Sequence, residues 1–321
     1  MKLARPFVRL PFNFDADQLL KEANQFQEHQ WMAHPSRMNG NSALPLVSVN
    51  GEDNDDFAGE MLPTPHLEKC VYTQQIMSQL DEVIARSRFM RLAAHAEVSP
   101  HVDFNYHWYS RVRVHIPVIT NPQVTFYCGD EQVHMQAGEC WIFDSWRRHR
   151  VTNNSEQTRI HLVIDTAGSG KFWQTVRQME KLENSNVEPK LIPFKQGKSA
   201  SIRTEKYNVS PIMAPGELEA MVTELIDDFS ANPNNPAALV KEYQTLLESF
   251  AKDWRALWLQ YGWEQSAVAH YRKLLTQTVQ QLHPNPRALT TSKNDVGINP
   301  IFMQRIIRAA LFTNERERFV R

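Results

Sequence analysis

Hydrophobic and polar residues alternate differently in the middle of the chain than on either side of it. Between residues 89 and 167, short segments rich in β-branched and aromatic residues are separated by turn-forming residues. These segments are 89–98, 111–120, 123–136, 139–144, 149–154 and 158–167. Strands this short, with no helical pattern between them, favour an antiparallel sandwich or a jelly-roll barrel.

On both sides of this block, apolar residues recur with a helical period. The residues from 15 to 26 form an amphipathic pattern, with Asp15 or Asp17 near its start, and 72–87 predicts a second helix. The intervening segment 34–69 is rich in Gly, Pro, Asn and Asp and predicts a loop. Beyond residue 170, helices are expected at 216–231, 239–257 and 301–312.

These patterns together predict a β-rich α+β fold with N-terminal helices and a helical C-terminal region. We expect two domains. Residues 1–170 would form the strand-rich domain with its helical support, and residues 171–321 would be mainly helical.

Composition narrows the classes of partner. The 321 residues include 35 Lys and Arg against 36 Asp and Glu, so no general field attracts nucleic acid or an anionic membrane. No apolar run approaches the ~18 residues of a spanning helix, and the N-terminal residues lack the apolar core of a signal peptide. The cysteines Cys70, Cys128 and Cys140 are widely spaced and suggest neither a disulfide framework nor a zinc site. A cytoplasmic protein is expected.

Polar residues with metal-binding chemistry occur inside the strand block. His101 and Asp103 stand two apart, and His149 precedes Arg159 by ten residues across a turn-forming segment. His149 and Arg159 would therefore lie on neighbouring antiparallel strands. Alternation along the strand 158–167 places Arg159 and His161 on a polar face, opposite an apolar face. We expect the polar face to line a cavity.

Two histidines and one carboxylate on one side of a metal leave three positions open, an arrangement that suits non-haem Fe(II). The His-x-Asp pair alone is a weak signal, since it occurs by chance in many proteins. Its combination with His149 and Arg159 inside one strand block is far more specific. An arginine deeper in the barrel could hold the far carboxylate of an organic acid such as 2-oxoglutarate.

The stretch covering residues 88–167 resembles the aspartyl/asparaginyl β-hydroxylase family of Fe(II)/2-oxoglutarate oxygenases. Its relatives include bacterial free-amino-acid hydroxylases of the proline 3-hydroxylase kind. The acidic residue Asp103 places the chain nearer this bacterial branch, because the animal peptidyl hydroxylases lack it. The resemblance implies a double-stranded β-helix, the jelly-roll or cupin-like barrel.

The resemblance also implies the roles of individual residues. The metal ligands would be His101, Asp103 and His149, and Arg159 would clamp 2-oxoglutarate. Further roles are implied or expected at the following positions: His115 and Arg91 near the cosubstrate, Arg113 at the substrate, and His107 at the substrate entrance or simply in a loop. The cofactors would be Fe(II), 2-oxoglutarate and O2.

The expected activity is hydroxylation of an unactivated C–H bond, with release of succinate and CO2. The substrate would be a free amino acid, or an Asp or Asn residue in a peptide, and no nucleic acid or membrane would take part. A rival interpretation is a non-oxygenase cupin-like metal-binding protein, either a sensor or an isomerase. That protein would need the metal ligands but not Arg159.

Overall fold

The structure is a computed structural model that describes residues 2–33, 40–198 and 200–312. These residues form two compact units. The first unit contains the described residues up to Asp103 together with Ser110–Lys206. The second contains Phe104–Tyr109 and the described residues from Tyr207 onward.

A large mixed sheet forms the centre of the first unit. Its strands follow the order β13-β1-β10-β7-β12-β5-β3-β2, with β14 also paired to β5 and β4 to β3. The bounds are β1 Phe7–Phe14, β2 Met32–Ala33, β3 Asn41–Val49, β4 Met61–Pro63, β5 Val83–Leu92, β7 Val112–Ile119, β10 Glu139–Phe143, β12 Arg159–Thr166, β13 Lys190–Ile192 and β14 Arg203–Thr204.

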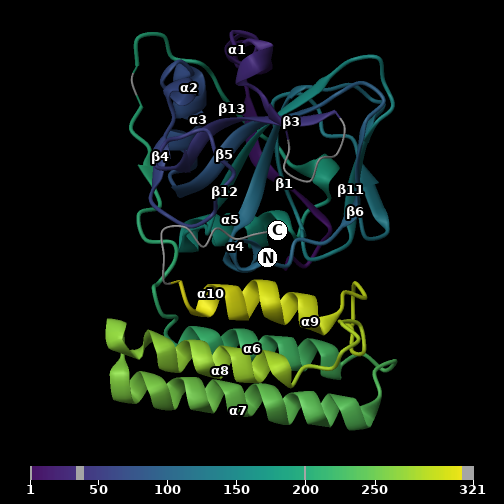
Figure 1. Ribbon diagram of the computed structural model, residues 1–321. Helices are drawn as coiled ribbons and strands as arrows, with labels where there is room; N and C mark the ends of the chain where they lie inside the picture. The colour runs from purple at the N-terminus through teal and green to yellow at the C-terminus, as the bar shows by residue number, and fades with distance from the viewer. Residues whose placement is uncertain (1, 34–39, 199, 313–321) are drawn as a thin grey trace. The chain divides into compact units, whose positions relative to one another are not determined.

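A smaller antiparallel sheet faces the large one. Its strands follow the order β6-β11-β8-β9, and their bounds are β6 Glu97–His101, β8 Val124–Cys128, β9 Glu131–Val133 and β11 His149–Asn153. Figure 1 shows β6 and β11 on one side of the large sheet, with the helices α2 (Pro65–Glu68) and α3 (Val71–Leu80) on the other. This two-sheet arrangement confirms the predicted jelly-roll core.

Strand β12 shows how the two faces of the large sheet differ. Ile160, Leu162 and Ile164 join a hydrophobic core with residues of α1 (Ala16–Ala23), α3 and α5 (Gly170–Met179). The alternate residues face the small sheet, where Leu92 and Phe126 belong to a second apolar cluster. Because side chains alternate along a strand, Arg159 and His161 enter the space between the sheets, as predicted.

The N-terminal region agrees with the sequence in part. Helix α1 begins after Asp15, whose carboxylate accepts a hydrogen bond from the backbone N–H of Gln18. The prediction of a helix over 72–87 was wrong in its second half. Helix α3 ends at Leu80, Asp81 adopts a left-handed conformation with φ 57°, and β5 follows. The predicted loop 34–69 was also wrong at β3, which is buried along its whole length between β5 and its outer neighbours.

The first unit extends to Lys206, beyond the predicted boundary at residue 170. The physical reason is strand pairing, because β13 adds a parallel strand beside β1 and β14 adds one beside β5. The backbone of Glu205 also accepts a hydrogen bond from Met61. The segment after α5 is therefore part of the sheet unit rather than a separate helical domain.

The second unit is helical. Its main helices are α6 (Pro215–Ser230), α7 (Ala237–Tyr261) and α8 (Val268–Gln280), followed by α9 (Ile298–Ile301), a π-helical turn (Phe302–Ile307) and α10 (Arg308–Ala310). Figure 1 shows these helices lying alongside one another. The short helix α4 (Tyr106–Ser110) begins within the 104–109 part of this unit. Among the described residues, no helix combines the length and the apolar character that a membrane span requires.

Candidate metal centre and cosubstrate pocket

The two predicted histidine ligands lie opposite each other on neighbouring strands. His101 ends β6 and His149 begins β11, and the antiparallel register pairs these two residues directly. Their ring centroids are 4.2 Å apart. Strand pairing therefore brings together two side chains that are far apart in the sequence.

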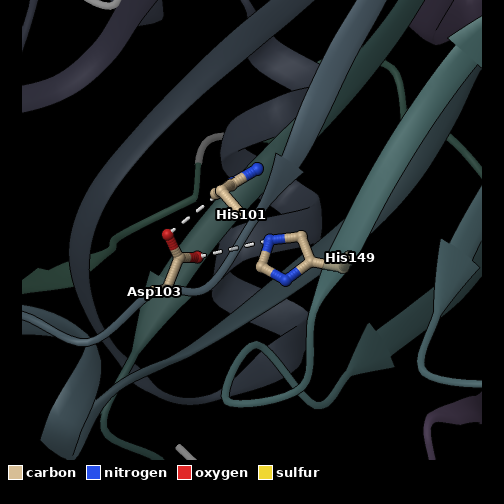
Figure 2. Close-up of side chains that lie close together, drawn as sticks. All are labelled: His101, Asp103 and His149. Carbon is tan, nitrogen blue, oxygen red and sulfur yellow. Dashed lines mark ion pairs between the residues drawn. The ribbon is translucent and has the colours of Figure 1, made fainter. Parts of the chain in front are cut away.

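Asp103 supplies an acidic group at the same point. Its carboxylate oxygens lie 3.9 Å from Nε2 of His101 and 3.8 Å from Nε2 of His149, and Figure 2 shows the carboxylate directed toward both residues. All three donor atoms lie within 4.8 Å of one another. The backbone N–H of Asp103 donates to the carbonyl of Ser145, 3.0 Å away, which holds this residue beside the turn before β11.

Backbone carbonyls orient both imidazoles. Nδ1 of His101 lies 2.8 Å from the carbonyl of Ser99, and Nδ1 of His149 lies 2.9 Å from that of Arg147. Because a carbonyl oxygen only accepts, each Nδ1 carries the proton and each Nε2 offers its lone pair. A hydrogen bond on the far ring nitrogen is the usual support for a metal-binding histidine.

The protonation state of His149 also suits the binding of a metal ion. Burial lowers the pKa of His149 to about 4, although the neighbouring Asp103 carboxylate opposes part of this shift. His149 is therefore neutral at pH 7, the form that binds a metal ion. Two imidazole nitrogens and one hard carboxylate oxygen on one side of a site could hold a divalent ion such as Fe(II) and leave further positions for other ligands.

Arg159 lies in the space between the sheets, where it is 5% exposed. Its guanidinium stands over the ring of Phe126 at 4.9 Å, and its Nε has no hydrogen-bond partner among the described residues. Burial lowers the pKa of Arg159 to about 9, and the charge of Arg113 adds to that effect. A guanidinium buried this way is well suited to an anionic ligand.

His115 and His161 lie near Arg159 in the space between the sheets. Both are buried, and neither ring nitrogen of either residue has a hydrogen-bond partner among the described residues. Their rings lie 5.7 Å apart, and each contacts Phe126. Burial lowers the pKa of both imidazoles well below the ordinary range, so both are neutral. Four buried ring nitrogens without partners indicate a ligand that would supply those partners.

Arg113 belongs to a buried ionic cluster next to this pocket. It donates through Nε to Asp165 at 3.0 Å, while Arg88 binds Asp55 and Arg86 stands between these two acids. The sequence did not single out Arg86, Arg88 or Asp55. The alternation Arg86-Ser-Arg88 was the available signal, but it was hidden by the apparent helical period over 72–87.

One predicted site residue lies on the other face of the sheet from Arg159. Arg91 pairs in register with Ile160, and its side chain therefore lies on the opposite face of the sheet from Arg159. There Arg91 donates to Glu28 and to Ser42 and lies over the ring of Trp31. The predicted place of Arg91 at the cosubstrate is wrong for this reason. His107 is buried against Trp108 within the second unit.

Comparison with known protein families identifies a family to which this chain is similar. Residues 15–168 match the family described as aspartyl/asparaginyl beta-hydroxylase. The match covers just under half of the chain, and this part of the chain is similar to that family. The match contains every residue of the metal centre and the pocket described above.

The sequence identity between this chain and individual similar proteins is low. Over 117 residues the chain is 29% identical to L-proline cis-4-hydroxylase from Rhizobium meliloti, which covers 36% of this chain and 40% of that protein. The chain thus spans less than half the length of this curated relative. A 2OG-Fe(II) oxygenase family structure from Burkholderia pseudomallei is similar at 16% identity, with a TM-score of 0.39, over 51% of this chain and 86% of that one. A prolyl-4-hydroxylase structure from Pseudomonas putida is similar at 11% identity, with a TM-score of 0.35, over 52% and 95% of the two chains.

Proposed function

We propose that this protein is an Fe(II)- and 2-oxoglutarate-dependent hydroxylase of an amino acid, or of an Asp or Asn residue in a peptide. The observation that carries the proposal is the combination of two features in one neighbourhood of the sheet unit, where the rings of Phe143 and His115 lie between them. One is the His101, Asp103 and His149 cluster, and the other is the buried guanidinium of Arg159. When bound, iron and 2-oxoglutarate would use O2 to hydroxylate an unactivated C–H bond, releasing succinate and CO2.

The ligand residues have one task, which is to hold the metal while leaving positions open. His101 and His149 would bind through Nε2, because their Nδ1 protons are engaged by backbone carbonyls. Asp103 would offset part of the metal charge. The pairing of β6 with β11 fixes the two imidazoles before any metal arrives, so little ordering would be needed on binding.

Arg159 would bind the distal carboxylate of 2-oxoglutarate. A guanidinium matches a carboxylate with two parallel hydrogen bonds, and burial strengthens such bonds by removing competing water. His115 and His161 would hydrogen-bond the same molecule through ring nitrogens that otherwise lack partners. The aromatic contacts with Phe126 would keep both rings in place.

Arg113 would pair with the carboxylate of the substrate. The ionic cluster contains three arginines, Arg86, Arg88 and Arg113, against the two acids Asp55 and Asp165. Arg159 adds a fourth positive charge nearby. This excess of positive charge in a buried region favours anionic ligands. The similarity to an L-proline hydroxylase supports a free amino acid over a peptide.

The decisive experiment is an anaerobic titration of metal-free protein with Fe(II) and then with 2-oxoglutarate. Chelation of Fe(II) by the 2-oxo acid gives a visible metal-to-ligand charge-transfer band. We expect this band in the wild type and a weaker band at equal 2-oxoglutarate in the Arg159→Ala protein. Tight Fe(II) binding without any band would overturn the oxygenase proposal and leave the cupin-like metal-binding protein as the better account.

A further inference from the structure

The ionic cluster of the sheet unit is a series of five side chains whose charges alternate. Arg113 donates to Asp165, and Asp165 also lies 3.7 Å from Nε of Arg86. Nη1 of Arg86 lies 3.9 Å from the carboxylate of Asp55, which in turn binds Arg88. The series therefore runs from Arg113 to Arg88, with an arginine at each end and two carboxylates within it.

Four of the five groups come from strands of the large sheet. On β12, Val163 pairs in register with Arg88 of β5, and Asp165 pairs with Arg113 of β7. Residues two apart on a strand share a face, so Val163 and Asp165 lie on the same face as His161. Both end arginines of the series thus project from the face of the sheet that looks toward the small sheet.

Asp55 is the member of the series that a loop supplies. It lies between β3 and β4, in the segment 50–60, which we call the 50–60 loop. The side chain of Asp55 is 17% exposed, against 4% for Arg86 and for Arg88 and 2% for Asp165. The 50–60 loop therefore brings a partly exposed carboxylate onto two arginines that the sheet buries.

Further contacts hold Asp55 in this position. Its backbone carbonyl accepts a hydrogen bond from Nη1 of Arg86 at 3.1 Å. The guanidinium of Arg86 also stands 4.0 Å from the centre of the Phe57 ring. The side-chain amide of Asn54 donates to the carbonyl of Val49 at 2.9 Å, which closes the start of the loop. The carboxylate of Asp55 is therefore fixed by its loop as well as by its ion pairs.

Arg113 and Asp55 are the two members of the series that solvent reaches most, with side chains 15% and 17% exposed. A ligand that enters therefore meets a guanidinium at one point and a carboxylate at another. A single guanidinium, that of Arg86, lies between Asp55 and the acid that binds Arg113. A carboxylate held at Arg113 fits this arrangement, whereas a second carboxylate directed at Arg86 or Arg88 would meet the negative charge of Asp55.

We propose that Asp55 is a specificity-determining residue that excludes substrates with a second carboxylate. Arg113 would bind the one carboxylate of the substrate, and Asp55 would occupy Arg86 and Arg88 so that they bind no other. The substrate class is then a free amino acid with an uncharged side chain rather than a dicarboxylic amino acid. This inference rests on the proposed function, because it takes Arg113 as the residue that binds the substrate.

The test compares L-glutamate with L-glutamine, which are nearly equal in size and differ by one negative charge. Anaerobic calorimetric titration of the full-length protein, loaded with Fe(II) and saturating 2-oxoglutarate, measures the affinity for each amino acid. Asp55→Asn removes the charge at almost constant volume. We expect this variant to bind L-glutamate roughly tenfold or more tightly than the wild type does, since a charge-assisted hydrogen bond becomes available. Its affinity for L-glutamine should not change.

A matched control lies in the same loop. Asp53 is 55% exposed and pairs with His66 at 3.2 Å, so Asp53→Asn removes a loop carboxylate that does not belong to the series. It should leave both affinities as in the wild type. Adding Arg88→Met to Asp55→Asn should abolish the gain in affinity for L-glutamate. If Asp55→Asn fails to fold alone, L-glutamate should restore its folding by replacing the missing carboxylate, and L-glutamine should not.

Three results would overturn the inference while leaving the proposed function intact. The first is an Asp55→Asn protein that binds L-glutamate no more tightly than the wild type does. The second is an equal gain for L-glutamate and L-glutamine, and the third is an unfolded variant that L-glutamate does not rescue. A wild-type protein that gives no charge-transfer band with Fe(II) and 2-oxoglutarate would instead remove the proposed function, and this inference with it.

Discussion

His101 and His149 are direct cross-strand partners, and both direct Nε2 toward the carboxylate of Asp103. The candidate metal centre is therefore formed by the pairing of β6 with β11 and by Asp103, which lies two residues beyond the end of β6. A substitution at either histidine removes a ligand without removing any hydrogen bond of the sheet ladder, because the ladder uses only backbone groups.

The first prediction concerns His149→Ala. We expect Fe(II) affinity to fall by more than roughly 100-fold, since loss of a ligand exceeds the loss of a supporting residue. The measurement is an anaerobic Fe(II) titration against a competing chelator. His95→Asn is the control, because His95 is an exposed histidine in a left-handed turn that asparagine tolerates. Equal Fe(II) affinity in His149→Ala and the wild type would rule out this metal centre.

The second prediction concerns Arg91, which the structure places on the outer face of the sheet. Arg91→Met should leave the 2-oxoglutarate concentration for half-maximal charge-transfer absorbance unchanged, whereas Arg159→Met should raise it by roughly 10–100-fold. The stability cost of Arg91→Met should be below about 1 kcal/mol, since its partner Glu28 is 80% exposed. If Arg91→Met raised the 2-oxoglutarate concentration for half-maximal absorbance by a similar factor, Arg91 would have to contact the cosubstrate.

The strands between residues 89 and 167 could be predicted from the sequence, because residues within each segment and the turn-forming residues beside it determine them. Turn-forming residues separate these strands, and β7, β10, β11 and β12 each match a predicted segment within a few residues. The predicted segment 123–136 instead contains two strands, β8 and β9. The ligand residues could be proposed from their spacing, but the prediction that His149 and Arg159 lie on neighbouring antiparallel strands was wrong. Strand β11, which carries His149, pairs with β6 and β8 in the small sheet, whereas β12, which carries Arg159, pairs with β5 and β7 in the large sheet.

The outer part of the sheet was harder to predict. In β3 every residue is buried, so no alternation distinguishes it from an apolar loop, and Pro45 and the flanking Asn and Gly residues suggested a turn. In 72–87 the helical period of α3 continues by chance into β5, and only Asp81 in its left-handed conformation ends the helix. Tertiary pairing, rather than local preference, decides both elements.

Arg91 shows a different limit. Arg91 directly precedes Leu92, and neighbouring residues on a strand direct their side chains to opposite faces of the sheet. Only the register between β5 and β12, which pairs Leu92 with Arg159, reveals the face on which Arg91 lies. The contacts of Phe104–Tyr109 within the helical unit could likewise not be predicted from the sequence, because their partners Glu217 and Arg305 are more than a hundred residues away.

The third prediction concerns Arg113 and its buried partner Asp165. Arg113→Met should lower kcat/KM for a free amino acid substrate at least tenfold, if loss of one charge-assisted hydrogen bond costs about 1.5 kcal/mol or more. It should also destabilise the fold by about 3–5 kcal/mol, since Asp165 is 1% exposed and loses its hydrogen-bonded arginine.

A double variant separates these two effects. Arg113→Met combined with Asp165→Asn removes the buried negative charge, so it should recover part of the stability but none of the kcat/KM. Succinate release with a panel of L-amino acids that includes L-proline measures activity, and urea unfolding measures stability. Full kcat/KM in the double variant would exclude Arg113 from substrate recognition.

The fourth prediction concerns the pH dependence of stability in the metal-free protein. Burial lowers the pKa of His161 well below that of an unfolded histidine, about 6.5. Below pH 6.5 the unfolded chain therefore binds a proton at this residue while the folded chain does not. The free energy of unfolding should fall with decreasing pH by about 1.4 kcal/mol per pH unit for this residue alone.

His161→Leu removes that contribution. As the pH falls from 6.5 to 5, its free energy of unfolding should fall less steeply than that of the wild type. The difference in slope should approach about 1.4 kcal/mol per pH unit near pH 5, and above about pH 8 the two slopes should coincide. Urea unfolding at a series of pH values measures both slopes. Cys140→Ala is the matched control, because it truncates a fully buried side chain whose pKa burial raises far above this range. That control should lower stability equally at every pH, and a slope in His161→Leu identical to the wild type would mean that His161 is protonated in the folded protein.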